Sequence, residues 1–511
     1  MSRILPASPS LEHLRKQAKE LLRDFERDDP VAIERLRVEG SRPGSVAPKL
    51  ADALHALARE YGFSSWPALK RQVEALNRPA DHFETLAALI KANDTAGAGE
   101  LLARHPELRA KLDAPLPGYA FGGTALLAAV QRGSREMIDL LLHAGADING
   151  RSHWWAGSFG VLDDDRGLAT FLIERGATID VHAASRLGME DRLRALIAAG
   201  PALVHARGGD GQTPLHVAST LSIAGFLLDQ GADIDARDVD HESTPAQYMV
   251  RDRQEIARYL VSRGCRTDIL MAAALGDLKL VRRHLEADPA SIRTSVSEKY
   301  FPKQDRRSGG SIYIWTLGQN KTAHLIAREF GHEEVYRFLM ERSPDELKLA
   351  LACEAGDEPL FRAMLMSQPN LVRTLSEDGR RKLADAAQSN STAAVRLMLE
   401  AGWPADVRGQ HGGTPLHWAS WHGNAEMVRE ILRYQPPLEA GADEGFDGPP
   451  LGWAMHGSEN GWHKATGDYG ATVEALLRAG AKAPELTEDL EASPAARGAL
   501  RQFLENRRAE R

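Results

Sequence analysis

The stretch Thr213–Ala218 reads TPLHVA, and Thr414–Ala419 reads TPLHWA further along the chain. In each, threonine can cap the coming helix and leucine begins its buried face. Proline suits the first helical position because its missing N–H is not needed there. Eroded copies of the phrase begin at Thr124, Thr244 and Thr322. A helix-opening phrase that recurs along one chain predicts a solenoid of stacked units.

A second phrase closes these units. It reads AGADIN at Ala144–Asn149 and QGADID at Gln230–Asp235, with a shorter form at Ala479–Ala481. Glycine ends a helix because the residue after the last turn usually takes a left-handed conformation, which costs glycine least. Before the closing phrase, apolar residues recur at helical spacing, as in Met427–Leu432. One helical pair cannot bury that face alone, so neighbouring units are expected to stack.

Together the two phrases resemble the ankyrin repeat, whose unit is a turn plus two antiparallel helices. Residues 413–436 and 211–237 match it best. The resemblance implies an all-α, ankyrin-type α-solenoid over residues 82–484. Units of about 33 residues give roughly a dozen helix-turn-helix repeats. In the unit that begins at Gly211, Thr220 runs directly into the next apolar segment, so we expect its first helix to be shortened.

Residues 1–78 and 485–511 fall outside the repeats. The first segment contains helical stripes such as Leu11–Phe25, which predict a small N-terminal helical domain covering one end of the solenoid. Its slight basic surplus forms neither a dense basic face nor a groove-reading element, which argues against nucleic acid as a partner. The last segment reads as an amphipathic capping helix.

Composition limits the remaining classes. The chain has 511 residues, 43% of them hydrophobic, and a net charge of -8. It has no apolar run of about twenty residues, so we expect no membrane span. Its start lacks a continuous apolar segment of the secretory type, and we expect a cytoplasmic protein. Cys265 and Cys353 are too few for a disulfide framework or a cysteine-built zinc site, so both are expected to be buried thiols.

Residues 291–320 form an insertion where a repeat needs only a short link. Gly309 and Gly310 precede the β-branched and aromatic run Ile312–Trp315, which predicts a projecting loop or β-hairpin. Two of its rings are candidate partner-binding residues: Tyr313 and Trp315. Basic residues interleaved with rings can bind phosphate and stack bases, but rings that fold back onto the repeat are the commoner outcome. The basic residues are Lys299, Lys303, Arg306 and Arg307.

Tryptophan and histidine are enriched between residues 403 and 463, which hold five of the nine tryptophans and five of the eighteen histidines. A uniform distribution would place about one tryptophan and two histidines there. The resemblance implies that the two positions after the seven-residue phrase TPLHxAx, and the turn before it, face a ligand. These positions are Gln410, His411, Trp421 and His422.

The histidines of the phrase itself, His216 and His417, are expected to be structural and to hydrogen-bond the adjacent turn. The spacing of the remaining histidines matches no compact metal motif, so we expect no metal and no cofactor.

The unit after Trp421 is interrupted by a polar, glycine-rich stretch, residues 456–470, longer than the fold requires. Long ordered loops tend to carry function. The unit and its interruption add six candidate partner-binding residues: Trp453, His456, Trp462, His463, Asp468 and Tyr469. A similar break at residues 152–160 adds Trp154 and Trp155.

These observations favour a protein–protein interaction scaffold that binds a protein or peptide on the concave face of the array. Tryptophan and tyrosine on a rigid surface make efficient anchors. The alternative is an enzyme or a binder of a sugar-like small molecule in a groove between the interrupted repeats. Its acid–base candidates would be Asp163–Asp165, Asp468 and either His456 or His463. We expect no enzyme, because nucleophile, phosphate-loop and zinc-protease signatures are absent. The sequence leaves the oligomeric state open.

Overall fold

The structure is a computed structural model that describes residues 5–6, 9–36, 48–63, 65–76, 81–163, 166–443, 447–487 and 490–509. Contacts divide the chain into two units, Met1–Thr85 and Leu86–Arg511, and each is described by itself. The regular elements of the described residues are helices, apart from one isolated β-bridge between Ser295 and Thr322. The all-α prediction is confirmed.

The first unit is helical and has a core of its own. Its helices are α1 (Leu11–Glu26), α2 (Pro30–Leu36), α3 (Leu50–Glu60) and α4 (Trp66–Leu76). The Ser10 hydroxyl caps α1 by accepting a hydrogen bond from the N–H of His13. Leu21, Leu57 and Leu69 are fully or almost fully buried between the helices.

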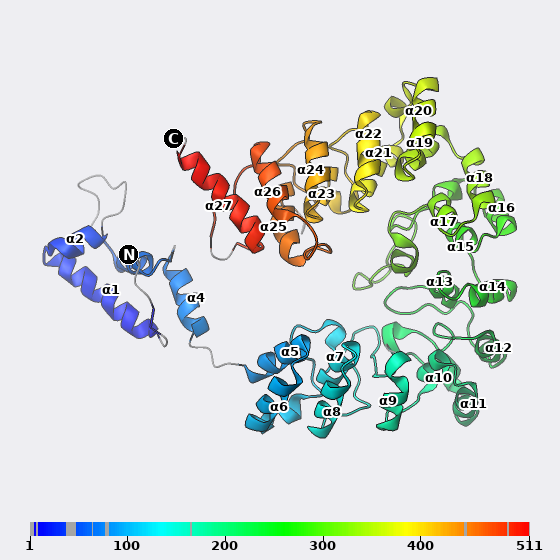
Figure 1. Cartoon of the computed structure of the whole chain (residues 1–511), viewed down its shortest axis with the longest axis horizontal. Helices are drawn as coiled ribbons and strands as arrows, with labels where there is room; N and C mark the ends of the chain where they lie inside the picture. The colour runs from blue at the N-terminus through cyan, green and yellow to red at the C-terminus, as the bar shows by residue number, and fades with distance from the viewer. Residues whose placement is uncertain are drawn as a thin grey trace. The chain divides into compact units, whose positions relative to one another are not determined.

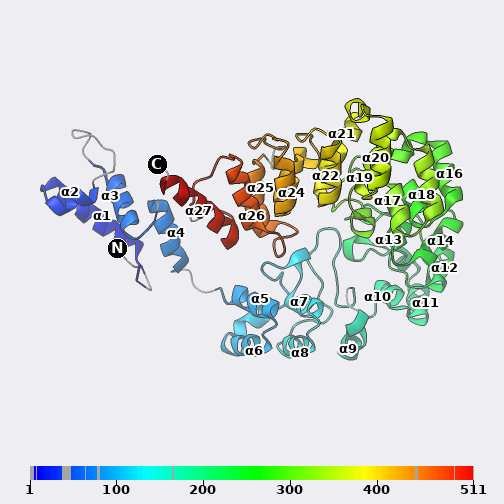
Figure 2. The same cartoon turned by 45° about the horizontal axis from the view of Figure 1, so that its top comes forward.

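From α5 onward, short antiparallel helices follow one another in pairs (Figures 1 and 2). The earlier ones are α5 (His82–Ala92), α6 (Thr95–Arg104), α7 (Ala125–Gln131), α8 (Arg135–His143), α9 (Ala169–Glu174), α10 (Val181–Leu187), α11 (Glu190–Ala199), α12 (Leu221–Asp229), α13 (Pro245–Met249), α14 (Gln254–Ser262), α15 (Ile269–Ala274) and α16 (Leu278–Ala287). The later ones are α17 (Ala323–Glu329), α18 (Glu333–Arg342), α19 (Asp345–Glu354), α20 (Glu358–Ser367), α21 (Glu377–Gln388), α22 (Thr392–Glu400), α23 (Pro415–Trp421), α24 (Ala425–Leu432), α25 (Pro450–Asn460), α26 (Tyr469–Arg478) and α27 (Pro494–Ala509).

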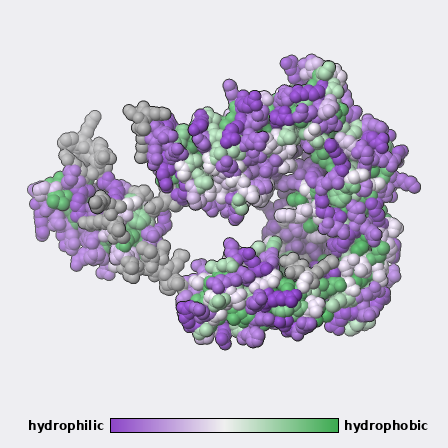
Figure 3. All heavy atoms as spheres, viewed as in Figure 1, coloured by the Kyte–Doolittle hydropathy of each residue, from purple (hydrophilic) through white to green (hydrophobic). Residues whose placement is uncertain are grey.

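The core of the second unit lies between neighbouring pairs. One buried cluster extends from Val181 to Leu351 and a second from Leu349 to Leu500, so each pair shares its apolar face with the next. In the space-filling view, polar residues cover most of the visible surface, with smaller apolar patches scattered among them (Figure 3). Helix α27 packs on α26 through residues such as Leu500.

A tight turn with the same geometry precedes three of the opening phrases, those at Thr124, Thr213 and Thr414. Phe121, Asp210 and His411 each lie three residues before the threonine of a phrase, and their φ angles of 57°, 54° and 55° are left-handed. Each turn is tied to the following unit by a backbone hydrogen bond, as from Val239 N–H to the Asp210 carbonyl at 2.8 Å. Asp443 N–H donates to the His411 carbonyl in the same way, at 2.9 Å. These bonds fix the register between successive repeats.

The histidines of the phrase have the predicted structural role. Thr213 N–H donates to His216 Nδ1 at 3.0 Å, and the other ring nitrogen bonds the Ser243 carbonyl at 3.1 Å. Because Nδ1 accepts, Nε2 carries the hydrogen. Burial lowers the pKa of His216 to about 3, so the ring is neutral at pH 7. Each ring therefore joins its own helix to the turn of the next unit.

The unit that begins at Gly211 confirms the expected shortening. Residues 214–217 form only a turn, and the first helix after them is α12. Thr220 caps α12 by accepting from Ile223 N–H at 3.2 Å.

Of the two forms predicted for the insertion, a loop or a β-hairpin, the β-hairpin is wrong. In the described chain, Ile314–Gly318 form one turn of π-helix, and residues 291–320 contain no strand. The Tyr313 ring is fully buried, its edge meets Phe301 at 5.4 Å, and its hydroxyl donates to Asp268 at 2.9 Å. A lone two-stranded hairpin is marginally stable in water, whereas this arrangement buries a large ring in the repeat core.

Two further expectations concern the whole chain. Cys265 and Cys353 are buried free thiols, as predicted, and burial raises the pKa of both. Among the described helices, none has the length and apolar character that crossing a bilayer requires.

Candidate functional site

Six of the ten partner-binding residues predicted between residues 410 and 469 meet at one pocket of about 440 Å³. The predicted residues that line it are Gln410, His411, Trp421, Trp453, His456 and Trp462. The residues that sequence analysis missed are Gln319, Gln388, Trp418, Asp447, Gly448 and Gly452. A concavity of this size, mostly aromatic with a few polar groups, is typical of a ligand site.

Four tryptophans form the walls. Trp418 and Trp421 lie one turn apart on α23, Trp453 lies on α25, and Trp462 follows the end of α25. The Trp418 and Trp462 rings are nearly parallel, at 17° with 6.2 Å between centroids. Trp453 stands at 89° to Trp418, and Trp421 at 84° to Trp462. One pair of ring planes is therefore nearly parallel and two pairs are nearly perpendicular; we call these four residues the tryptophan box.

A glycine on α25 lets the box close. A Cβ on Gly457 would lie 2.6 Å from the Trp421 carbonyl oxygen, so only glycine lets the two helices approach this closely. Helix α25 continues to Asn460, so the predicted loop of residues 456–470 is shorter than expected. The added helical turn carries His456 at the pocket, and Trp462 follows just beyond it.

An amide cluster closes one side of the pocket. Gln410 Oε1 accepts hydrogen bonds from Gln319 Nε2 at 2.6 Å and from Gln388 Nε2 at 2.7 Å. Asn320 donates to Gln388 Oε1 at 3.0 Å. Gln319 and Asn320 come from the end of the insertion, and Gln388 ends α21. The insertion is therefore built into the site, although far from it in sequence.

The described lining of the pocket carries few charged side chains. Burial lowers the pKa of His411, and it lowers that of His417 behind the pocket to about 4, so both rings are neutral at pH 7. Asp447, which is exposed, is the charged lining residue among those the structure describes. The indole nitrogens of Trp418 and Trp421 are buried and, within the described chain, have no hydrogen-bond partner.

Several predicted residues support the box from behind and do not face the pocket. His422 is 2% exposed and bonds the Gln388 carbonyl at 2.8 Å. Tyr469, also 2% exposed, donates to the Trp421 carbonyl at 2.8 Å. The Asp468 carboxylate caps α26 through Ala471 N–H. The His463 ring meets that of His422 at 5.0 Å. Their enrichment reflects packing around the tryptophans.

The other predicted rings lie elsewhere. The Trp154 indole donates to Asp210 at 3.0 Å, and the Arg307 guanidinium lies 4.2 Å from the Trp155 ring. These contacts fasten the break at residues 152–160 to a turn and to the insertion. Trp315 is 71% exposed and outside the pocket lining, whereas Tyr313 is too buried to meet a partner.

The acid–base candidates do not converge. The Asp163 side chain is 4% exposed and pairs with Arg151 at 3.2 Å and Arg186 at 2.7 Å. Asp164 and Asp165 lie outside the described residues. His456 Nδ1 lies 2.9 Å from Glu491. No described residue of the first break lines the pocket, so the two breaks do not form one groove.

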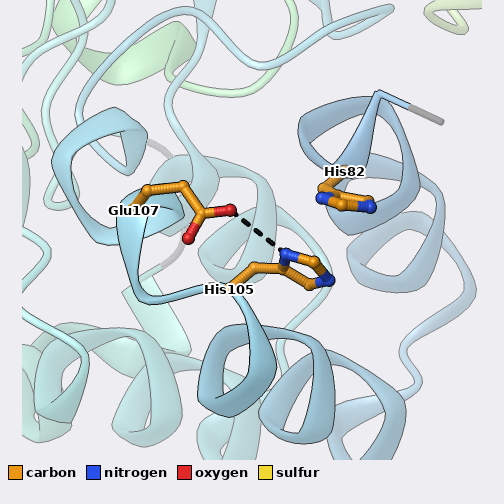
Figure 4. Close-up of side chains that lie close together, drawn as sticks. All are labelled: His82, His105 and Glu107. Carbon is orange, nitrogen blue, oxygen red and sulfur yellow. Dashed lines mark hydrogen bonds and ion pairs between the residues drawn. The ribbon is translucent and has the colours of Figure 1, made fainter. Parts of the chain in front are cut away.

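Imidazoles and carboxylates also meet away from the pocket. Asp210, Asp240 and His241 each bring one ligand atom to within 4.8 Å of the others. All three are engaged by protein groups: Trp154 Nε1, Gly309 N–H and the Gly310 carbonyl respectively. His105 Nδ1 lies 3.1 Å from a Glu107 carboxylate oxygen, and a dashed line marks this contact in Figure 4. These contacts tie loops together.

Sequence reasoning missed residues for two reasons. Trp418 lies inside the opening phrase, where a buried role is expected, but its spacing from Trp421 puts both on one helix face. That spacing was an available signal. Gln319 and Gln388 belong to other units and carry no local signal, because only the stacking of repeats brings them to Gln410.

Comparison with known proteins gives the family. Residues 181–270 and 349–443 match a model of three ankyrin repeats, and residues 121–153 match a single ankyrin repeat. The E3 ubiquitin-protein ligase KEG of Arabidopsis thaliana is 23% identical over 385 residues, which are 71% of this chain and 20% of that protein. The E3 ubiquitin-protein ligase XB3 of Oryza sativa subsp. japonica is 31% identical over 93 residues, 18% of this chain and 21% of that protein.

The match to one viral relative covers almost the whole length of that protein. The putative ankyrin repeat protein FPV223 of Fowlpox virus is 26% identical over 129 residues, 24% of this chain and 89% of that protein. By contrast, this chain spans only about a fifth of either plant ligase. The repeats and these relatives support a protein-interaction role. The phrases, the stacked helix pairs and the family matches agree, and the chain is an ankyrin repeat protein.

Proposed function

We propose that this protein binds a protein or peptide partner and that the tryptophan box is its main anchor point. The observation that carries the proposal is the pocket of about 440 Å³. Large aromatic side chains in a well-packed concavity dominate binding energies at interfaces, and truncation of one can cost about 2 kcal/mol or more. The array supplies the rigid frame on which such anchors are effective.

Two features suit a peptide. Trp462 closes the box while 62% of its surface stays exposed, so it is placed to cover a bound segment. The surrounding residues are held by their own contacts, so the site is preorganised.

The proposal is tested by comparative affinity capture. Wild type, Trp462→Ala and Trp315→Ala are immobilised in equal amounts and exposed to the same lysate. Captured proteins are quantified by mass spectrometry, and each specific one is then purified and titrated against all three. Trp315→Ala is a matched control because it also removes one exposed indole, but away from the pocket.

We expect Trp462→Ala to lower the affinity for a specific partner by about thirtyfold, which corresponds to about 2 kcal/mol of binding free energy. Trp315→Ala should retain wild-type affinity. Equal affinity of all three proteins for every specific partner would refute the role of the box.

A further inference from the structure

All four rings of the tryptophan box line the pocket, and their planes differ in orientation. Trp418 and Trp462 are nearly parallel, while Trp453 stands perpendicular to Trp418 at a centroid distance of 5.2 Å. The face of an aromatic ring carries negative partial charge and attracts a cation within about 6 Å of its centroid. A compact cation inside such a box meets several faces at once, and the attraction strengthens where water is excluded.

The charges around the pocket favour the same occupant. The described lining contains no lysine or arginine, and it includes the Asp447 carboxylate. The Glu491 carboxylate lies against the lining residue His456 at 2.9 Å. Burial keeps His411 neutral at pH 7 by lowering its pKa, so that ring does not oppose a positive ligand. An anionic ligand would find no lysine or arginine among the described lining residues.

Hydrogen bonding distinguishes one cation from another. An ordinary lysine ammonium brings three N–H donors and an arginine guanidinium five, and each donor needs an acceptor when it leaves water. Gln410 Oε1 already accepts two bonds and Gln388 Oε1 accepts one from Asn320. The tryptophans offer only donors. A fully methylated ammonium keeps its charge but has no N–H to satisfy.

We infer that the tryptophan box takes the methylated ammonium group of a lysine side chain on the partner, held by the ring faces and by Asp447 at the exposed edge. The inference rests on the proposed function and specifies the residue that occupies its anchor point. It predicts that the modification state of the partner controls binding.

The test uses full-length protein and small defined ligands, measured by calorimetry. The first pair is choline and 3,3-dimethylbutan-1-ol, which have nearly the same shape but differ in charge. The second pair is one short peptide with either trimethyl-lysine or unmodified lysine at its centre. Each ligand is titrated into wild type, Trp462→Ala, Asp447→Asn and Trp315→Ala.

We expect choline to bind at least tenfold more tightly than the alcohol, and the trimethylated peptide at least tenfold more tightly than the unmodified one. Trp462→Ala should abolish both preferences. Asp447→Asn should lower the affinity for choline and for the trimethylated peptide and leave the affinity for the alcohol unchanged. Trp315→Ala should bind every ligand as wild type does. Circular dichroism establishes that each variant is folded.

Three results would overturn the inference. Equal affinity for choline and the alcohol would show a merely apolar pocket. Choline binding without discrimination between the peptides would assign the box to a free quaternary ammonium compound. If neither cation binds while Trp462→Ala still loses its captured partner, the box anchors a partner through other chemistry, and only the present inference fails.

Discussion

Replacing His417 by glutamine should make the protein less sensitive to acid. His417 Nδ1 accepts from Thr414 N–H at 3.1 Å, and its Nε2 bonds the Gly448 carbonyl at 3.2 Å. In the unit that begins at Thr244, Gln247 caps the helix instead, accepting from Thr244 N–H at 2.9 Å. The chain thus shows that glutamine can replace this acceptor. At pH 7 the variant should lose the bond to Gly448 and the contact of Thr414 Oγ1 with the ring, together about 1–3 kcal/mol.

The pH dependence follows from burial. Burial lowers the pKa of His417 from 6.5 to about 4, so in this range the unfolded chain binds a proton that the folded chain does not. Stability contributed by the neutral ring is therefore complete above pH 6.5 and falls as the pH drops toward 4. At pH 5 the loss from this one group is about 2 kcal/mol. His417→Gln removes that loss.

The assay is urea unfolding of both proteins at pH 7 and pH 5, followed by circular dichroism. Other buried groups titrate too; burial raises the pKa of Asp210 to about 6, for example, which acts in the opposite direction. These groups are present in both proteins, so they cancel in the difference. The gap between wild type and variant should shift by about 2 kcal/mol in favour of glutamine at pH 5. An unchanged gap would refute the neutral-histidine argument.

Two further substitutions test the packing that builds the site. Gly457→Ala would place a Cβ 2.6 Å from the Trp421 carbonyl oxygen and should destabilise by about 1–3 kcal/mol in thermal melts. Gly498→Ala in α27, where a Cβ has no neighbour within 4 Å, should be neutral or stabilise by about 1 kcal/mol; equal losses would contradict the close-approach argument. Tyr313→Phe removes the donor to buried Asp268 and should cost about 1–3 kcal/mol in urea unfolding. A loss below about 0.5 kcal/mol would show that this bond contributes little.

Much of the fold could be predicted from local sequence. The TPLH phrase specifies a cap, a proline suited to the first turn and an internal histidine bond, and all three involve neighbours within a few residues. The failure at Ile312–Trp315 is instructive, because a β-branched, aromatic run is equally suited to a strand and to a buried core segment. Burial of Tyr313 against Asp268 decided between them, and Asp268 lies in another repeat.

The sequence predicted which residue types gather near the pocket but not which of their side chains face it. Enrichment correctly drew attention to the segment containing the tryptophan box. It could not separate Trp462, which faces the pocket, from Tyr469, whose hydroxyl braces the Trp421 carbonyl. That distinction depends on how α25 approaches α23, which Gly457 permits.

The most direct test of the account is hydroxyl-radical footprinting of the protein with and without a captured partner. Oxidation of Trp462, which is 62% exposed in the free protein, should fall at least severalfold on binding. Oxidation of Trp315, which is 71% exposed, should stay unchanged. Protection of Trp315 with Trp462 still reactive would contradict the claim that the tryptophan box is where the partner is held.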